Sequence, residues 1–327
     1  YNIHIDIWLN DDVCYYSDGS SMKLNKSYRY RVVDVFTTEP LEGNPLAVFP
    51  DASDLSTPLM QKIAREFNLS ETVFVFPATL AECAAKLRIF TPGKEMDFAG
   101  HPTVGTAYIL LDERKVLPGA AQFVVEENVG PISISVESGA AAKIWLKTPA
   151  LREGAFVDKS IAAALLGLNV SQLLDKPPQL LDAGNPTLFI PLADRETVDA
   201  IVFDTSAWKQ FKLAHPDPLC VFAFTPTPEG AYSRMFAPDY GIAEDPATGS
   251  STGPLAAYMM KHSLCSSQAD AQFYSEQGTR IGRRSILHVH LHGKNGVDGI
   301  AVGGNVTPVL EGCLLYTSPS PRDRQKS

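Results

Sequence analysis

An internal repeat constrains the fold of this chain more than any other feature of its sequence. The segment GNPLAVFP at residues 43–50 matches GNPTLFIP at residues 184–191 in its Gly-Asn-Pro start and its final proline. Further on, RIFTP at residues 88–92 matches RMFAP at residues 234–238. Matches that keep the same order along the chain predict two structurally similar domains, each a copy of one supersecondary unit.

Each copy continues into a glycine that begins a predicted helix, Gly100 in the segment 98–115 and Gly249 in the segment 244–262. With these glycines included, the matched positions are offset by 141 to 149 residues. A helix N-terminus exposes unpaired backbone N–H groups and a partial positive charge, and both attract anions. A pseudo-twofold pair of domains directs its two helix N-termini toward one cleft, which predicts an anion site there.

The rest of the pattern predicts an α+β fold. Alternating, β-branched or aromatic segments predict strands at residues 30–40, 43–50, 71–77, 85–92, 121–126, 131–136, 142–147, 184–191, 219–226, 232–238, 286–293 and 300–310. Helical periodicity and capping signals add helices at residues 57–68 and 158–167. Because strands outnumber helices and hairpin-length links separate many of them, the chain does not read as an alternating βαβ protein.

Composition narrows the class of protein. A chain of 327 residues, 45% hydrophobic and 20% charged, can bury the cores of two domains. Its net charge of −9 argues against nucleic acid or an anionic membrane as the main partner. The five cysteines form no CxxC pair, and no apolar run reaches the roughly 18 residues of a membrane helix. These features predict a cytoplasmic protein whose partner is a small molecule.

Both ends of the chain look foreign to the fold. Residues 1–27 lack the basic start and apolar core of a signal peptide, and Met22 is a plausible start. Residues 313–327 resemble a translated sequencing adapter. We therefore expect a leader, a first domain at residues 28–128, a second domain at residues 129–312 whose last strand may return to the first domain, and an added tail.

Three polar residues stand at positions where chemistry is plausible. Glu71 lies between a helix end and a strand, while His101 and Asp245 stand close to the two helix N-termini. Each has an ordinary interpretation as a turn or capping residue. The repeat favours a functional one, because it places His101 and Asp245 at equivalent helix ends. An acid/base pair beside an anion site suits proton removal next to a carboxylate.

Long motifs resemble the phenazine-biosynthesis isomerase (PhzF) family. They are VDVFTTEPLEGNPLAVF (33–49), IAREFNLSETVFV (63–75), RIFTPGKEMDFAGHPTVGTA (88–107), RMFAPDYGIAEDPATGSSTGPLA (234–256) and QGTRIGR (277–283). The resemblance covers residues from about 28 to 312 and implies two homologous domains of diaminopimelate epimerase-like fold. Each domain is then a curved, mostly antiparallel sheet or barrel around a central helix.

The resemblance also implies a function. It implies isomerisation of a small carboxylate by proton transfer, without cofactor or metal, in the cleft between the domains. Glu71 matches the family's acid/base glutamate, and His101 and Asp245 match residues that hydrogen-bond the substrate and assist protonation. The residues that match donors around the substrate carboxylate are Ser70, Gly100, Gly249 and Ser250. Members of the family often form homodimers.

Some positions depart from related patterns. Diaminopimelate epimerases use two cysteines at the helix ends, where this chain has His101 and Ser250, so a two-thiol mechanism is not expected. Thr279–Arg280 interrupts a segment that is often more acidic in the family, and GNPTL stands where a His or Arg near the substrate can occur. Because of both departures, the sequence does not predict the identity of the substrate. The family's last strand should continue past Gly312 into the adapter-like tail.

A serine hydrolase is a rival interpretation. Gly249-Ser250-Ser251-Thr252-Gly253 formally matches the G-x-S-x-G nucleophile motif. That motif needs a strand directly before the serine. Here turn-forming residues, including Pro246, precede it, and the isomerase is therefore preferred.

A zinc site is a second rival, since His288, His290 and His292 alternate along one predicted strand. The preferred interpretation is a polar strand face opposite Leu287, Val289 and Leu291. A third alternative is a catalytically silent family member that acts as a binding or scaffold protein. The presence of Glu71, His101 and Asp245 together argues against that alternative.

Overall fold

The structure is a computed structural model that describes residues 8–10, 13–15, 21–23, 26–139, 142–266, 268, 270–292 and 299–316. Near the N-terminus, three short strands pair only with one another in the described part of the chain. They are β1 (Trp8–Asn10), β2 (Val13–Tyr15) and β3 (Ser21–Lys23).

After these three strands, the first half adds eight strands and two helices among the described residues. The strands are β4 (Lys26–Val35), β5 (Asn44–Phe49), β6 (Thr72–Phe76), β7 (Lys86–Phe90), β8 (Glu95–Met96), β9 (Gln122–Glu127), β10 (Gly130–Glu137) and β11 (Lys143–Lys147). The helices are α1 (Thr57–Phe67) and α2 (Gly100–Asp112). The first has Pro58 in its first turn and ends where Asn68 takes the left-handed conformation.

The second half adds ten strands and four helices among the described residues. The strands are β12 (Arg152–Phe156), β13 (Gln179–Asp182), β14 (Thr187–Pro191), β15 (Cys220–Thr227), β16 (Gly230–Ala237), β17 (Ile242–Asp245), β18 (Gln272–Gln277), β19 (Ser285–Leu291), β20 (Ile300–Gly304) and β21 (Val306–Tyr316). The helices are α3 (Lys159–Leu165), α4 (Arg195–Asp199), α5 (Thr205–Lys212) and α6 (Gly249–Lys261). Short 3-10 turns lie at Val170–Gln172, Pro238–Tyr240 and Thr279–Ile281.

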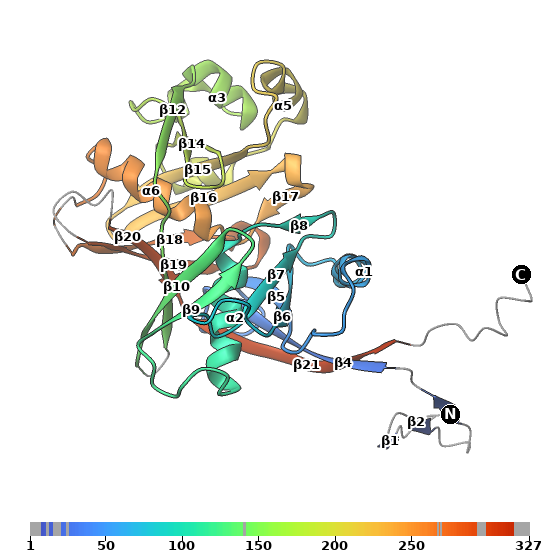
Figure 1. Cartoon of the computed structure of the whole chain (residues 1–327). Helices are drawn as coiled ribbons and strands as arrows, with labels where there is room; N and C mark the ends of the chain where they lie inside the picture. The colour runs from blue at the N-terminus through green and yellow to red at the C-terminus, as the bar shows by residue number, and fades with distance from the viewer. Residues whose placement is uncertain are drawn as a thin grey trace, which may run out of the picture.

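Strand pairing follows the same pattern in both halves. Strands β5 and β6 pair in parallel, as do β14 and β15, and the parallel pair of β7 with β9 matches that of β16 with β18. The other pairings between described strands are antiparallel, including β11 with β20, which joins the halves. The last strand β21 runs along β4 of the first half (Figure 1). The predicted α+β class with two similar halves is therefore confirmed.

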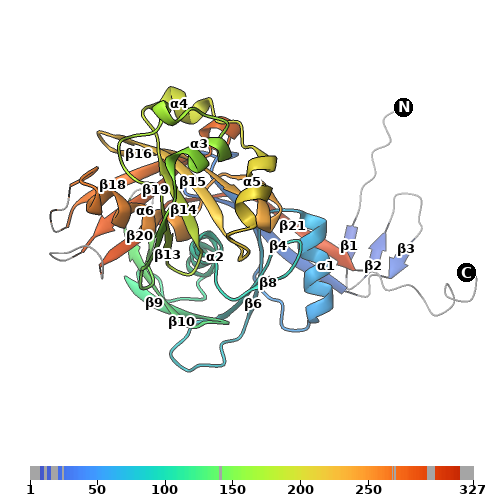
Figure 2. The same cartoon turned by 90° about the horizontal axis from the view of Figure 1, so that it is seen from above.

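Each half encloses one central helix. Helix α2 buries Val104, Ala107 and Leu110 against the strands of the first half, and α6 buries Leu255 and Met259 in the second. Figure 2 shows α2 toward the middle of the molecule, whereas α1 lies at its edge. Because these two helices are enclosed by sheet, their ends are held in fixed places relative to the strands.

The structure corrects the sequence-based prediction in detail. The single strand expected at residues 300–310 is two strands, since the chain changes partners at Asn305: β20 pairs with β11 and β19, and β21 pairs with β4. Elements β8, β12, β13, β17, β18, α4 and α5 were not predicted.

The predicted boundaries and ends remain predictions. The boundary at residues 128 and 129 lies in the turn between β9 and β10. Within the predicted tail, Cys313–Tyr316 belongs to β21 and pairs with Lys26–Arg29. Residues 317–327 and most of the predicted leader lie outside the described residues.

Candidate active site

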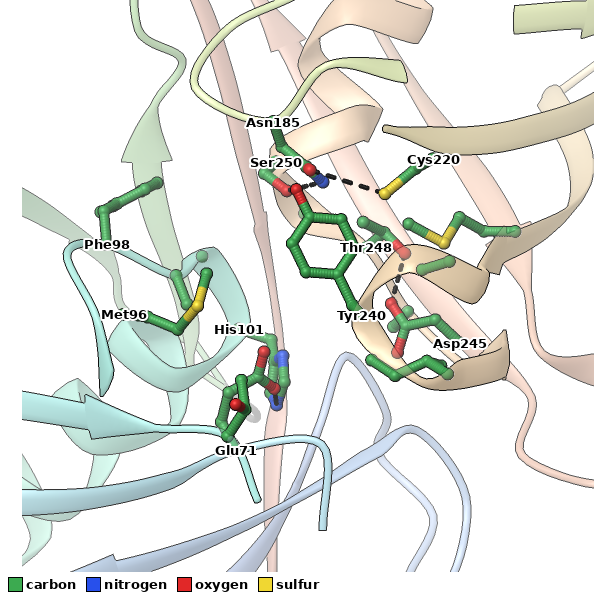
Figure 3. A pocket seen from close by; sticks show the side chains of 18 of the residues that line it. Glu71, Met96, Phe98, His101, Asn185, Cys220, Tyr240, Asp245, Thr248 and Ser250 are labelled. Carbon is green, nitrogen blue, oxygen red and sulfur yellow. Dashed lines mark hydrogen bonds and ion pairs between the residues drawn. The ribbon is translucent and has the colours of Figure 1, made fainter. Parts of the chain in front are cut away.

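A cavity of about 110 Å³ lies between the two halves, around the N-terminal ends of α2 and α6 (Figure 3). The first half supplies Glu71, Thr91, Met96, Phe98, Ala99, Gly100 and His101 to its wall. The second half supplies Gly184, Asn185, Cys220, Met235, Ala237, Tyr240, Ile242, Asp245, Ala247, Thr248, Gly249 and Ser250. Six of the seven predicted site residues therefore meet at one cavity, and only Ser70, which precedes Glu71, does not line it.

The two central helices begin at this cavity without side-chain caps. Neither N-cap residue, Ala99 of α2 or Thr248 of α6, makes a side-chain capping bond. The helix ends also approach closely, since a Cβ atom on Gly100 would lie 3.4 Å from the backbone nitrogen of Ser250. The backbone hydrogen bonds of these helices start with the N–H groups of Thr103 in α2 and Ser251 in α6. The N–H groups before them point out of the helix ends, so the positive ends of two helices converge here.

Other helices of the chain show how unusual this arrangement is. Asp158, Asp194 and Asp204 cap α3, α4 and α5 by accepting hydrogen bonds from backbone N–H groups in the first turn. Helix α1 has no such bond, but its first turn contains Pro58, which has no N–H to satisfy. Uncapped donors thus coincide with the cavity, where an anion can take the place of a cap.

Glu71 and His101 form a buried contact on one side of the cavity. The Oε2 atom of Glu71 lies 3.4 Å from Nε2 of His101, and the side chains are 14% and 7% exposed. Burial raises the pKa of Glu71 to about 8, with a smaller contribution from the negative charge of Asp245. Burial also lowers the pKa of His101 to about 3, so its imidazole is neutral at pH 7. A carboxyl group with such a pKa can both release and take up a proton near neutral pH.

Asp245 lies across the cavity at the end of β17. Its Oδ1 accepts a hydrogen bond from Nδ2 of Asn44 at 3.0 Å, and its Oδ2 accepts one from the hydroxyl of Thr248. Burial raises the pKa of Asp245 to about 6, although these hydrogen bonds oppose the shift. The carboxylate is therefore held in one orientation by partners from both halves of the chain.

Asn44 is a site residue that the sequence analysis missed. Its Nδ2 also donates to the carbonyl oxygen of Ala247 at 3.0 Å and lies 3.4 Å from Nδ1 of His101. Its repeat counterpart Asn185 donates to the Ser250 hydroxyl at 3.2 Å. Both belong to the repeated Gly-Asn-Pro motif, which was the available signal.

The remaining wall of the cavity is mostly apolar. Met96, Phe98, Met235, Tyr240 and Ile242 face it, and no Lys or Arg is among the lining residues in the described ranges. Burial raises the pKa of the Cys220 thiol to about 12, which leaves it uncharged and weakly nucleophilic. The cavity can therefore hold an uncharged molecular body, with its anionic group at the helix ends.

The serine hydrolase alternative finds no support in the geometry. Ser251 is fully buried within α6, and its hydroxyl is 2.9 Å from that of Thr187. It does not stand on a turn that follows a strand directly, as a nucleophile elbow requires.

The histidine strand has the predicted alternation. Leu287, Val289 and Leu291 of β19 are buried, and His288 and His290 pack against the ring of Trp145 on the other face. His290 and His292, together with the exposed Asp270, place potential metal-ligand atoms within 4.8 Å of one another. That group lies apart from the cavity described above, whose lining includes none of the three.

A repeated sheet around two central helices, with a cavity at their converging ends, defines the epimerase-like class of proteins. A family model described as phenazine biosynthesis-like protein (PhzC–PhzF) matches residues 33–312. The chain belongs to this family, as the sequence analysis predicted.

Named relatives and solved structures agree with this assignment. An uncharacterised isomerase of Mesorhizobium japonicum is 39% identical over 301 residues, covering 88% of this chain and 98% of the relative. The trans-2,3-dihydro-3-hydroxyanthranilate isomerase of Pseudomonas aeruginosa is 35% identical over 288 residues, covering 87% and 98%. A Bacillus anthracis PhzF-family structure superposes with a TM-score of 0.81 at 26% identity, covering 89% of this chain and all of that one. The chain is an isomerase of the PhzF type.

More distant structures share the fold alone. A hydroxyproline epimerase from Agrobacterium vitis superposes with a TM-score of 0.63 at 11% identity, covering 91% of this chain and 95% of that one. Separately, no helix in the described ranges is long and apolar enough to cross a membrane.

Proposed function

We propose that this chain isomerises a small carboxylate without a cofactor, by moving a proton between two of the substrate's carbons. Glu71 carries the proton, and the reaction takes place in the cavity between the two halves. The observation that carries this proposal is the buried contact of Glu71 with a neutral His101, beside two uncapped helix ends.

The substrate carboxylate lies against the first-turn N–H groups of α2 and α6. Removing a proton from a carbon conjugated with that carboxylate sends negative charge toward its oxygens, where the N–H groups of Gly100, Gly249 and Ser250 stabilise it. Glu71 accepts the proton and returns it to another carbon. His101 and Asp245 orient the substrate by hydrogen bonds.

The nature of the cavity wall suggests the substrate class. A carboxylate on an uncharged ring fits a site with helix ends on one side and Met96, Phe98 and Tyr240 on the other. The substrate named for the Pseudomonas aeruginosa relative, a dihydro-hydroxyanthranilate, has this character. Cyclic amino- and hydroxy-carboxylates related to it are therefore the first candidates.

Deuterium uptake tests the proposed function. The purified chain is incubated in D₂O with a panel of cyclic and acyclic amino- or hydroxy-carboxylates, and incorporation at carbon is followed by proton NMR. We expect a shifted double bond together with deuterium at the receiving carbon for at least one cyclic carboxylate. If no member of the panel showed a shifted double bond or deuterium uptake, that would contradict the isomerase proposal and favour the binding or scaffold alternative.

The pH dependence of kcat/KM provides a second prediction. Glu71 must be ionised to accept a proton, so kcat/KM is expected to rise about tenfold per pH unit below its pKa and to stop rising near pH 8. Because Asp245 contributes to the shift, the apparent value belongs to the coupled pair. Initial rates between pH 5.5 and 9.5 on the exchanging substrate measure this profile. A rate independent of pH over that range would exclude Glu71 as the base.

Location and assembly also belong to this proposal. The described cysteines Cys83, Cys220, Cys265 and Cys313 are free thiols, which fits a reducing, cytoplasmic environment. We further propose a homodimer, following the family, and sedimentation analysis of the purified chain would test it.

A further inference from the structure

The repeat extends to two strands that follow the central helices. QFVVEE in β9 (Gln122–Glu127) and QFYSEQ in β18 (Gln272–Gln277) are offset by 150 residues and share Gln, Phe and Glu at their first, second and fifth positions. Both strands pair in parallel with the equivalent strand of their half, β7 or β16. Their last residues, Glu127 and Gln277, differ only in carrying a carboxyl or an amide group.

Gln277 holds the beginning of α6. Its side-chain Oε1 accepts a hydrogen bond from the backbone N–H of Thr248 at 3.2 Å, and its Nε2 donates to the Thr248 hydroxyl at 3.0 Å. The same Nε2 donates to the backbone oxygen of Asp245 at 2.7 Å. Thr248 is the N-cap residue of α6, so a fully buried, neutral side chain fixes the backbone just before the helix.

Glu127 occupies the equivalent place at α2. The backbone N–H of Ala99, the N-cap residue of that helix, lies close enough to the Glu127 carboxyl group to lower its pKa. The hydroxyl of Thr103 lies 2.5 Å from Oε1 of Glu127. The residue is 3% exposed, and its Oε2 has no hydrogen-bond partner among the described residues. In both halves, the end of this strand thus holds the N-cap backbone.

The contacts of Thr103 bear on whether the Glu127 carboxyl group carries a proton. Its Oγ1 lies 2.5 Å from Glu127 and 2.7 Å from the carbonyl oxygen of Ala99, but a hydroxyl has one proton to donate. If that proton goes to the carbonyl, the short contact with Glu127 needs a proton on the carboxyl group. Burial raises the pKa of Glu127 to about 8, which agrees with a protonated acid at neutral pH. A protonated glutamate is close in shape to the glutamine of the other half.

We propose that Glu127 and Gln277 are a matched pair of positioning residues, each of which fixes the N-cap backbone of one central helix with a neutral side chain. Neutrality leaves the first-turn N–H groups and the positive helix ends available to the substrate carboxylate. An ionised carboxylate there would repel a second anion, in contrast to Asp158, which caps a helix that does not begin at the cavity. The identity of the anion rests on the proposed function, whereas the protonated state of Glu127 does not.

Other ionisable groups surround Glu127 on the neighbouring elements. Glu126 forms an ion pair with Lys86, and Glu95 forms one with Arg88. Asp97 is exposed to solvent. His101 lies beside Glu71 at the cavity. The causes of the raised pKa of Glu127 are burial, opposed by its own hydrogen bonds, and include no neighbouring charge. The ionisation of Glu127 is therefore expected to appear as a difference in pH dependence between wild type and Glu127→Gln.

Kinetics on the exchanging carboxylate test the role in binding. Glu127→Gln keeps the neutral contacts, so its KM at pH 7 is expected to stay within about twofold of wild type. As Glu127 ionises between pH 7 and pH 9, the wild-type KM is expected to rise at least fivefold, whereas the KM of Glu127→Gln stays level. The matched variant Gln277→Glu is expected to raise KM at pH 7 or above. Equal KM profiles for wild type and Glu127→Gln would overturn the proposed role in anion binding.

Urea unfolding tests the protonated state without any substrate. The folded chain holds a proton at Glu127 that the unfolded chain releases above its usual pKa of 4.5, so wild type loses stability as pH rises toward 8. Glu127→Gln lacks this loss, and its unfolding midpoint is expected to move above that of wild type between pH 5 and pH 8. If the unfolding midpoints of wild type and Glu127→Gln change in parallel with pH, Glu127 is ionised in the folded chain. That result would overturn the proposal even if no carboxylate exchanges deuterium. Conversely, if the two unfolding midpoints diverge as pH rises but no carboxylate exchanges deuterium, only the proposed function is refuted.

Discussion

Glu71→Gln is expected to abolish isomerisation, with kcat lowered by roughly 10²- to 10⁴-fold, the range that a positioned acid/base group contributes. Glutamine has nearly the same shape as a protonated glutamate, so it preserves the contact beside His101 but cannot carry a proton. KM should change little, because the carboxylate is held by the helix ends. The measurements are kcat, KM and deuterium incorporation in D₂O.

The same variant is expected to be more stable than wild type at neutral pH. Burial raises the pKa of Glu71 from 4.5 to about 8, so the folded chain retains a proton that the unfolded chain has released. Wild type therefore loses stability as pH rises from about 4.5 to 8, and the Glu71→Gln variant has no such loss. At pH 7 the difference is on the order of 3 kcal/mol, from about 1.4 kcal/mol per pKa unit. Urea unfolding at pH 5 and pH 8 measures it.

A matched control is available on α1. Glu66 is exposed and lies five positions earlier, so Glu66→Gln should leave both turnover and the pH dependence of stability unchanged. If Glu71→Gln retained full deuterium exchange, another group would have to carry the proton. If it were less stable than wild type at pH 8, the buried carboxyl group would not be protonated in the folded chain.

The sequence predicted the parts of the fold that are repeated. The Gly-Asn-Pro and R-x-F-x-P matches indicated two similar halves, and the glycines after them located the beginnings of α2 and α6. The unpredicted elements carry weaker signals. Strand β8 has two residues, β12 is exposed along its whole length, and α4 has five residues. Such elements form because neighbouring strands and caps hold them, and periodicity does not reveal this.

The site was predictable only in part for a similar reason. Glu71, His101 and Asp245 lie in long family motifs, and the structure brings all three to one cavity, although their roles remain proposals. Asn44 is different, since its contact with Asp245 spans 201 residues and exists only after the halves have come together. Gln277 likewise acts on Thr248 from the end of a strand that was not predicted. Local sequence patterns do not specify which distant backbone groups a buried amide will satisfy.

Asp245→Asn is expected to lower kcat/KM by roughly 10²-fold and to shift its pH profile toward lower pH. Both oxygens of Asp245 accept hydrogen bonds, from Asn44 and from Thr248. An asparagine offers one acceptor, so its amide N–H group must face one of these donors. The negative charge of Asp245 also helps to raise the pKa of Glu71, and removing it lowers that pKa. The rising limb of kcat/KM should then level off below pH 8.

The pH profile separates this role from that of an ordinary turn residue. A merely structural loss would lower the rate and the melting temperature together and leave the midpoint of the profile in place. Asp97→Asn is the control, because Asp97 is exposed between Met96 and Phe98, which both line the cavity. Asp97→Asn removes a negative charge next to residues that line the cavity, and it should change neither kcat/KM nor the midpoint of its pH profile. An Asp245→Asn profile that kept the wild-type midpoint would mean that Asp245 does not act on Glu71 through its charge, and would leave it the role of orienting the helix end.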